Sequence, residues 1–168
     1  MSLLASRRTE PVLSAALALS AVGAALVSQH RFDLQPCPWC VLQRLIFVLG
    51  AAIALVEAAA VMRTAHPWIV MMPGSRALLA LLGLAAALWQ HFVAAASASC
   101  QLTLADRILA ATGLDGLLPD VFQPRASCLE AQAWLLGVPY EFWSAALFVM
   151  LAGLAWRSLR TLKGPSTA

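Results

Sequence analysis

Two cysteines separated by two residues, Cys37 and Cys40, form the part of this sequence whose residue types most clearly suggest chemistry. They belong to the segment Pro36–Cys40, and Arg44 follows four residues after the second cysteine. Cysteines at this spacing close a small disulfide easily, and such motifs lower the pKa of a thiol. A fixed cation one helical turn away can stabilise a thiolate or an electron-accepting ring. The group therefore predicts redox chemistry.

A membrane helix must position these side chains. Pro36 and Pro38 stiffen the chain just before a long apolar run, and Pro38 suits a first helical turn because its missing amide hydrogen costs nothing there. Cys40 would then lie in the first turn, where the helix dipole favours a thiolate. Arg44 shares its face and leans back toward the N-terminus. An arginine here is typically one that reaches toward lipid phosphates, but beneath two cysteines we favour the functional interpretation.

The composition is that of a membrane protein. Only 11% of the 168 residues are charged and the mean hydropathy is +0.80, whereas soluble domains carry about 25% charged residues. Because each span needs about 20 apolar residues, the chain has room for several spans and no separate soluble catalytic domain. We therefore expect one domain over residues 1–168, surrounded by a lipid bilayer. The net charge of +3, spread over scattered arginines, does not favour nucleic acid as a partner.

Four apolar runs are long enough to cross a membrane, and they predict an all-α membrane protein built as a bundle of four transmembrane helices. The runs lie at roughly 11–29, 41–62, 77–92 and 139–156. Arginines before the first run also suit a signal peptide, but no convincing cleavage site closes that run. We therefore expect the first run to remain as a spanning helix.

Basic residues predict which way the helices face. Seven cations fall in the two termini and in the short turn between the second and third runs, against four elsewhere. By the positive-inside rule, both termini are cytoplasmic and the loops at roughly 30–40 and 94–138 face outward. The seven are Arg7, Arg8, Arg63, Arg76, Arg157, Arg160 and Lys163.

All four cysteines then fall on the outward side, with Cys37 and Cys40 in the first loop and Cys100 and Cys128 in the second. Disulfides persist in an oxidising compartment, and the natural pairs are Cys37 with Cys40 and Cys100 with Cys128. The second bond would close a loop of about 27 residues, which as a structural bond is worth about 3–4 kcal/mol. An exposed bond would instead be exchangeable, and the sequence leaves both interpretations open.

Metal and haem sites find little support. A structural zinc site made of four cysteines usually has two pairs with this close spacing, and here only one such pair exists. Haem attachment needs a histidine after the second cysteine, where Val41 stands. We expect no metal.

The second outward loop, residues 94–138, is too polar and too interrupted to span a membrane. Leu104, Ile108 and Leu109 recur at roughly helical spacing, which predicts a short amphipathic helix lying in the membrane interface. A loop that simply covers the spans is the alternative. In either case the segment would keep Cys100 near the membrane surface.

Two further titratable residues belong to the spans. His91, near the outward end of the third run, is typical of an anchor or a packed side chain, yet it should share a depth with Arg44. Together these two could hold the carbonyl oxygens of a quinone ring. Glu57 lies roughly 20 Å deeper than Arg44, at about 1.5 Å per helical residue, and we interpret it as structural or interfacial.

These features together resemble the DsbB family of bacterial inner-membrane disulfide bond formation proteins. The similarity covers nearly the whole chain: four spans, both outward loops and the order of the cysteines. Its most specific local signature is Gln29-His30, followed by Pro36–Cys40 and then Gln43-Arg44.

The resemblance implies an electron relay between two redox-active disulfides. A periplasmic dithiol carrier of the thioredoxin-fold DsbA type would attack the Cys100–Cys128 disulfide, with Cys100 forming the mixed disulfide. Electrons would pass by thiol–disulfide exchange to the Cys37–Cys40 pair, and from there to the membrane quinone pool.

The resemblance also implies the quinone site. Cys40 would face a ubiquinone or menaquinone, with Arg44 beside the ring and His91 where the family has its quinone-side histidine. Two positions depart from the family pattern. Gln43 stands where some members carry an acid, and Trp134 is shifted relative to Cys128, so no role is carried over to it.

Two alternatives remain. Quinone reductases of the vitamin K epoxide reductase type also use four-helix bundles and closely spaced cysteines, but their motif usually comes late, near the last span. A non-enzymatic membrane protein with structural disulfides is the other, and it predicts inert bonds and no quinone.

Overall fold

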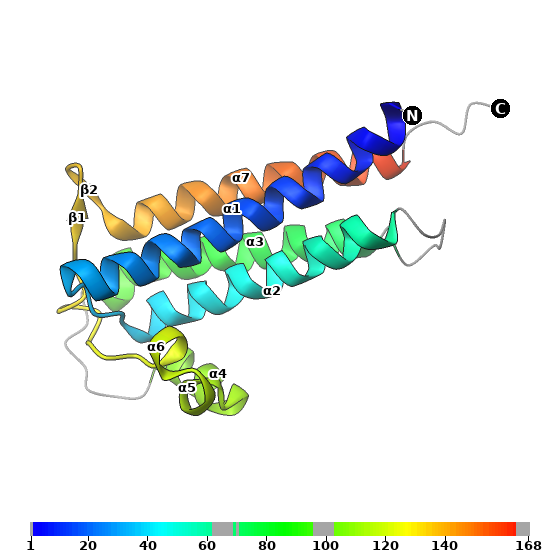
Figure 1. Cartoon of the computed structure of the whole chain (residues 1–168). Coiled ribbons are helices and arrows are strands. Elements are labelled where there is room, and N and C mark those ends of the chain that lie inside the picture. The colour runs from blue at the N-terminus through cyan, green and yellow to red at the C-terminus, as the bar shows by residue number, and fades with distance from the viewer. Residues whose placement is uncertain (1, 62–68, 70, 96–102, 164–168) are drawn as a thin grey trace.

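Four long helices run side by side as a bundle in the computed structural model (Figure 1). The structure describes residues 2–61, 69, 71–95 and 103–163, with side chains from residue 8 to residue 161 of these ranges. The helices are α1 (Ser2–Phe32), α2 (Pro38–Ala60), α3 (Met71–Trp89) and α7 (Tyr140–Lys163), and α3 continues into the π-helical turn η2 (Gln90–Ala94). All four are long and apolar enough to cross a membrane. The prediction of an all-α, four-span membrane protein is therefore confirmed.

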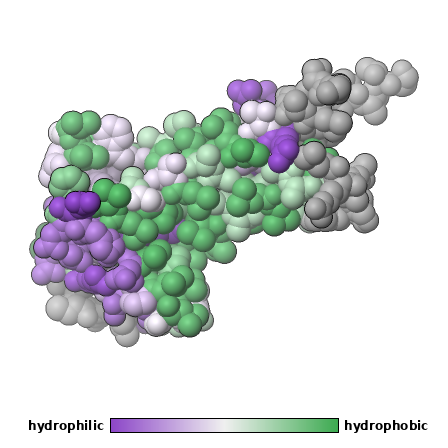
Figure 2. Space-filling view, in the orientation of Figure 1, coloured by the Kyte–Doolittle hydropathy of each residue, from purple (hydrophilic) through white to green (hydrophobic). Residues whose placement is uncertain are grey.

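The face of the bundle seen in Figure 2 is apolar along most of its length, as its green side chains show. Leu55, Leu78 and Val149 are each more than half exposed. Purple side chains gather at the end that carries the cysteines, which we call the cysteine end. The start of α1 and the end of α7 lie at the opposite end, which we call the far end (Figure 1).

The far end is held together by Arg76, which the sequence placed in a loop. α3 begins at Met71, several residues before the predicted start at 77, and this puts Arg76 inside the helix with 5% of its surface exposed. Its guanidinium donates to Glu57 at 2.8 Å and 3.2 Å, to Ser14 at 2.8 Å and to Ser158 at 3.0 Å. One side chain from each long helix therefore meets here. Arg76 does not count as a loop cation, because its charge is buried against Glu57.

Removing Arg76 from this cluster should strongly reduce the free energy of unfolding. Arg76→Ala leaves the Glu57 carboxylate buried without its partner, and we expect the free energy of unfolding to fall by about 3–5 kcal/mol. Arg125→Ala is the matched control, because both side chains of its pair with Asp120 are exposed, at 36% and 71%, and it should cost no more than about 1 kcal/mol. Unfolding in detergent micelles measures both. Equal losses in the two variants would contradict the assignment.

Three short helices and a hairpin cover the cysteine end. They are α4 (Leu104–Thr112), α5 (Leu114–Leu117), α6 (Pro119–Phe122), and the strands β1 (Trp134–Leu135) and β2 (Val138–Pro139). Thr103 and Asp106 form a capping box at the start of α4, and Gly113 ends it with φ of +65°. The predicted amphipathic helix is therefore confirmed as α4, while the sequence analysis did not predict α5, α6 or the hairpin.

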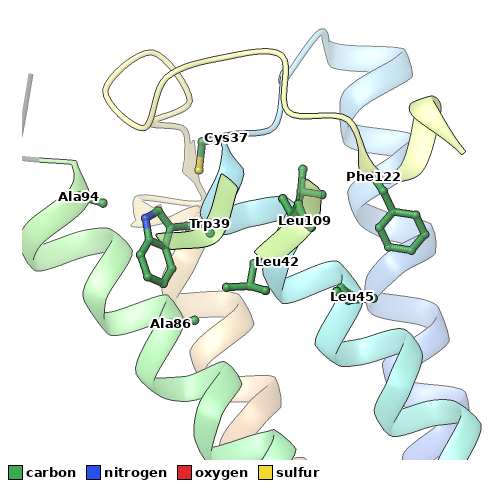
Figure 3. Close-up of a cluster of buried hydrophobic side chains, with 10 residues drawn as sticks. Cys37, Trp39, Leu42, Leu45, Ala86, Ala94, Leu109 and Phe122 are labelled. Atoms are coloured by element: carbon green, nitrogen blue, oxygen red, sulfur yellow. The ribbon is translucent and has the colours of Figure 1, made fainter. Parts of the chain in front are cut away.

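α4 lies across the outer part of α2, and Figure 3 shows the cluster of buried side chains that joins them. Leu109 of α4 packs with Trp39, Leu42 and Leu45 of α2, and Phe122 of α6 extends the same cluster. Leu104, on the other face of α4, is 62% exposed. The short helices thus share one apolar core with the start of α2, which fixes the loop over the cysteines.

Candidate functional site

Cys37 and Cys40 meet at the N-terminus of α2. Cys37 is the N-cap residue, and its Sγ accepts a hydrogen bond from the Cys40 amide at 3.3 Å. The two Sγ atoms lie 2.9 Å apart, and both residues are free thiols. Pro38 occupies the first turn as the sequence predicted. The structure thus shows this pair with its two sulfurs in direct contact, and its redox activity remains a prediction.

Cys128 joins this pair through a backbone junction between the two loops. The carbonyl oxygen of Pro36 accepts hydrogen bonds from the amides of Arg125 and Ala126, at 2.9 Å and 3.3 Å. This junction brings Cys128 into hydrogen-bonding contact with Cys37. The sequence predicted that all these cysteines face one side, but it did not predict that Cys128 touches Cys37. Cys100 lies outside the described residues, so its pairing with Cys128 remains a prediction.

The hydrogen bond between Cys37 and Cys128 shifts the pKa values of these two thiols in opposite directions. The thiol of Cys37 donates to Cys128, which lowers the pKa of Cys128, and the Trp39 amide at the start of α2 lowers it further. The same bond, with that to Cys40 and burial, raises the pKa of Cys37 well above its ordinary value. Cys128 is therefore the more acidic of these two thiols in the reduced protein. Its contact with Cys37 puts Cys37 where the sulfur attacked by a Cys128 thiolate should be.

Alkylation of the reduced protein should reveal this difference. We expect Cys128 to react with iodoacetamide at lower pH than Cys37, because its lowered pKa keeps the thiolate populated as the pH falls. Cys37→Ala removes the S–H donor, so the pKa of Cys128 should rise and its alkylation midpoint should move to higher pH. Mass spectrometry of the labelled peptides gives both midpoints. An unchanged midpoint in Cys37→Ala would show that the hydrogen bond does not control Cys128.

A hydrogen-bonded pair of glutamines lies beside Cys40, and one of them, Gln90, contacts its sulfur. The side-chain amide of Gln90, in η2, donates to Cys40 Sγ at 3.2 Å, and its oxygen accepts from Gln43 at 2.8 Å. Both glutamines are buried. Gln43 stands where an acid was expected from some relatives, and a neutral amide here orients Gln90 without adding a negative charge beside a thiolate. A donor aimed at Cys40 favours its charged form as a leaving group.

Arg44 is buried beneath Cys40, with 5% of its surface exposed. It donates to Gln29 at 2.7 Å and to the backbone oxygens of Val121 at 3.2 Å and Ala25 at 3.5 Å. It therefore ties α1, α2 and α6 together rather than reaching for lipid phosphates. These bonds use three of its five N–H donors, and the guanidinium also lines the cavity described next.

A cavity of about 240 Å³ opens beside Cys40, between α1, α2 and α7. A cavity of about 150 Å³ accommodates a benzene ring, so this space is large enough for a substituted six-membered ring. Its walls are mainly apolar, with Phe47 and Leu147 among them. Its polar lining residues are Cys40, Gln43, Arg44, Gln90, Tyr140, Glu141 and Ser144. Few polar groups in an apolar pocket are typical of a small-molecule site.

His91 lies behind one of these polar groups. Its Nδ1 is 2.6 Å from Oε1 of Glu141, and Glu141 lines the cavity whereas His91 does not. The sequence predicted that His91 and Arg44 lie at one depth in the bilayer. Arg44 lines the cavity, and His91 contacts Glu141, which also lines it. The structure adds Glu141 between His91 and that space.

No role was predicted from the sequence for Gln29, Gln90 or Glu141, which the structure places in this site. Each lay beside a residue that the sequence did single out, because Gln90 precedes His91 and Gln29 begins the signature that ends at Arg44. Glu141 carried a signal of its own, as an acid in the first turn of a spanning helix. The packing of α7 against α3, which brings Glu141 to His91, could not be predicted from the sequence.

Comparisons with known proteins point to one family. The family model described as "Disulfide bond formation protein DsbB" matches residues 7–157. A "Disulfide bond formation protein B" of Ralstonia nicotianae is 33% identical over 156 residues, covering 88% of this chain and 91% of that protein. One of Cupriavidus necator is 30% identical over 161 residues, covering 95% and 97%. No solved structure gave a significant match.

Proposed function

The chain belongs to the DsbB family of disulfide bond formation proteins, and from this premise we propose that it reoxidises a periplasmic dithiol carrier and passes the electrons to a membrane quinone. The carrier is a thioredoxin-fold protein of the DsbA type. The chain would act in the bacterial inner membrane, with the cysteine end in the periplasm and both termini in the cytoplasm. The positive charges near the far end, Arg157 and Arg160 among them, support this orientation.

The first exchange opens the Cys100–Cys128 disulfide. A carrier thiolate attacks Cys100, a carrier–Cys100 disulfide forms, and Cys128 leaves as a thiolate. The second carrier thiol then displaces Cys100 and the carrier departs oxidised. The Trp39 amide, which lowers the pKa of Cys128, favours Cys128 as this leaving group.

The second exchange moves the electron pair to the helix N-terminus. The Cys128 thiolate attacks Cys37 in the Cys37–Cys40 disulfide, a Cys37–Cys128 bond forms, and Cys40 leaves as a thiolate. Cys100 then closes on Cys128, which restores the first disulfide and leaves Cys37 and Cys40 reduced. The contact between Cys128 and Cys37, rather than Cys40, supports this order.

The cavity beside Cys40 suits a quinone ring as the electron acceptor. Its volume fits one substituted ring, Arg44 and Gln43 offer N–H donors, and Cys40 supplies the electron-donating sulfur. A quinone accepts two electrons and two protons and can diffuse away in the bilayer as the quinol. Ubiquinone and menaquinone share this chemistry. His91 would contribute through Glu141.

One observation carries this function: Cys128 contacts Cys37, Cys37 contacts Cys40, and Cys40 lines a ring-sized cavity together with Arg44. The test is oxidation of a reduced DsbA-type carrier by the purified protein, with and without a water-soluble ubiquinone, while quinone absorbance is followed. We expect one quinone reduced for each carrier disulfide formed. Equal carrier oxidation with and without quinone would overturn the proposal.

A further inference from the structure

Glu141 is a buried acid that the movement of electrons between sulfurs does not use. It lies in the first turn of α7, 7% of its side chain is exposed, and it lines the cavity beside Cys40. A carboxylate placed at the edge of a bilayer, inside a mainly apolar pocket, is costly unless it is paired. Such residues are therefore candidates for a function.

His91 connects this acid to the outside. Oε1 of Glu141 and Nδ1 of His91 lie 2.6 Å apart, so the two share a hydrogen bond. The imidazole packs against the rings of Phe92 and Phe142, with centroids 4.8 Å and 4.6 Å away, which fixes its orientation. Its side chain is 31% exposed. The pair thus runs from the exposed surface of the protein to the wall of the cavity.

Electron transfer at this cavity also needs protons. Closing the Cys37–Cys40 disulfide from one thiol and one thiolate releases two electrons and one proton, whereas making a quinol consumes two of each. One proton must therefore come from elsewhere. Arg44 faces the same cavity but keeps its protons at all accessible pH values, so it orients the acceptor without supplying this proton.

We propose that Glu141 is the residue that donates this proton to the acceptor oxygen, and that His91 returns a proton to it from the periplasmic side. The inference rests on the proposed function. Before transfer, one proton is shared between the Glu141 carboxylate and the His91 ring. Afterwards the carboxylate and the neutral ring remain, and a water-borne proton restores the pair. Protons of the quinol would then enter from the same side as the electrons.

Tyr140 is the one other acidic side chain in the described lining of the cavity, besides Glu141 and the cysteine itself. Its hydroxyl donates to Ser28 at 3.4 Å, toward α1 and away from the His91 pair. No chain of hydrogen bonds among the described residues links Tyr140 to an exposed titratable group, whereas Glu141 has His91. The geometry therefore favours Glu141.

Substitution separates proton delivery from electron delivery. Glu141→Gln keeps the size and one hydrogen bond to His91 but carries no acidic proton, and we expect quinone reduction to slow about a hundredfold. Single-turnover exchange with the carrier should stay within about twofold, and Glu141→Asp should recover part of the rate. Asp115→Asn, at a half-buried acid of α5 that does not line the cavity, is the matched control. His91→Gln should slow turnover about tenfold, with rescue by added imidazole.

A second readout needs no quinone at all. Dicyclohexylcarbodiimide reacts with protonated carboxyl groups in apolar surroundings, so we expect an adduct on Glu141. Glu57, tied to Arg76, should remain unlabelled. Peptide mass spectrometry of the quinone-free protein measures both sites.

The outcomes distinguish this inference from the function on which it rests. A wild-type protein that never reduces quinone would remove both. An active wild type with an equally active Glu141→Gln variant, or with no Glu141 adduct, would overturn only the inference. A loss confined to Tyr140→Phe would also overturn it and assign the proton to Tyr140.

Discussion

Cys40→Ser is expected to end quinone-dependent oxidation of the carrier after a single round. The Cys40 sulfur is the leaving group of the second exchange and the atom at the cavity, and no other described cysteine lines that space. Without it the electron pair has no exit, so steady-state turnover should fall at least about a thousandfold, which corresponds to about 4 kcal/mol of transition-state stabilisation.

The same variant should still oxidise one equivalent of carrier. The Cys100–Cys128 disulfide does not depend on Cys40, so one carrier disulfide should form per protein and the reaction should then stop. Quenched-flow alkylation counts the carrier disulfides formed in each interval. Continued turnover in Cys40→Ser would show that electrons leave by another route. No first round would show that the loop disulfide is inert, as the structural-disulfide alternative predicts.

Arg44→Ala is expected to weaken quinone binding more than any other step. The guanidinium lines the cavity with donors left after its bonds to Gln29, Val121 and Ala25. A hydrogen bond to a charged group contributes about 1.5–3 kcal/mol, so the quinone KM should rise about 10- to 100-fold. Single-turnover exchange with the carrier should change less than about threefold.

Arg44 also holds helices together, and Arg44→Lys separates the two roles. Lysine keeps the charge but not the planar fork of donors, so its quinone KM should lie between those of the wild type and Arg44→Ala. Thermal unfolding reports the structural share of the loss. A KM change that tracks the unfolding temperature across the two variants, with equal loss of carrier exchange, would mean that Arg44 acts only through packing.

The spanning helices and the cysteine motif could be predicted because local chemistry determines them. An apolar run must become a helix in a bilayer, since its backbone has no other partner there, and Pro38 starts α2 for reasons contained in its own ring. The boundary at Arg76 was wrong because an arginine counts as a loop residue in the sequence. Only the packing of α2 and α3 shows that Glu57 neutralises it.

The contacts that organise the site depend on packing between distant segments. Cys128 reaches Cys37 because a backbone carbonyl, that of Pro36, binds two backbone amides, and no side-chain pattern encodes such a junction. The hairpin was equally hidden, because its two-residue turn places Leu136 at φ of +55°, a conformation usually taken by glycine or asparagine. Glu141 carried a local signal, but its partner His91 lies 50 residues away in the chain.

The pairing of Glu57 with Arg76 bears on how the chain enters the bilayer during synthesis. The two residues sit on consecutive spans, 19 positions apart, so α2 and α3 can partition into lipid as one helical hairpin whose opposite charges are already neutralised. A lone ionised side chain within a span is costly to insert, and the hairpin avoids that cost for both residues. Ser158 emerges last from the ribosome, so α7 completes the cluster only after the other three spans are in place. Assembly of the four-helix bundle thus ends with the same helix that carries Glu141 to the cavity.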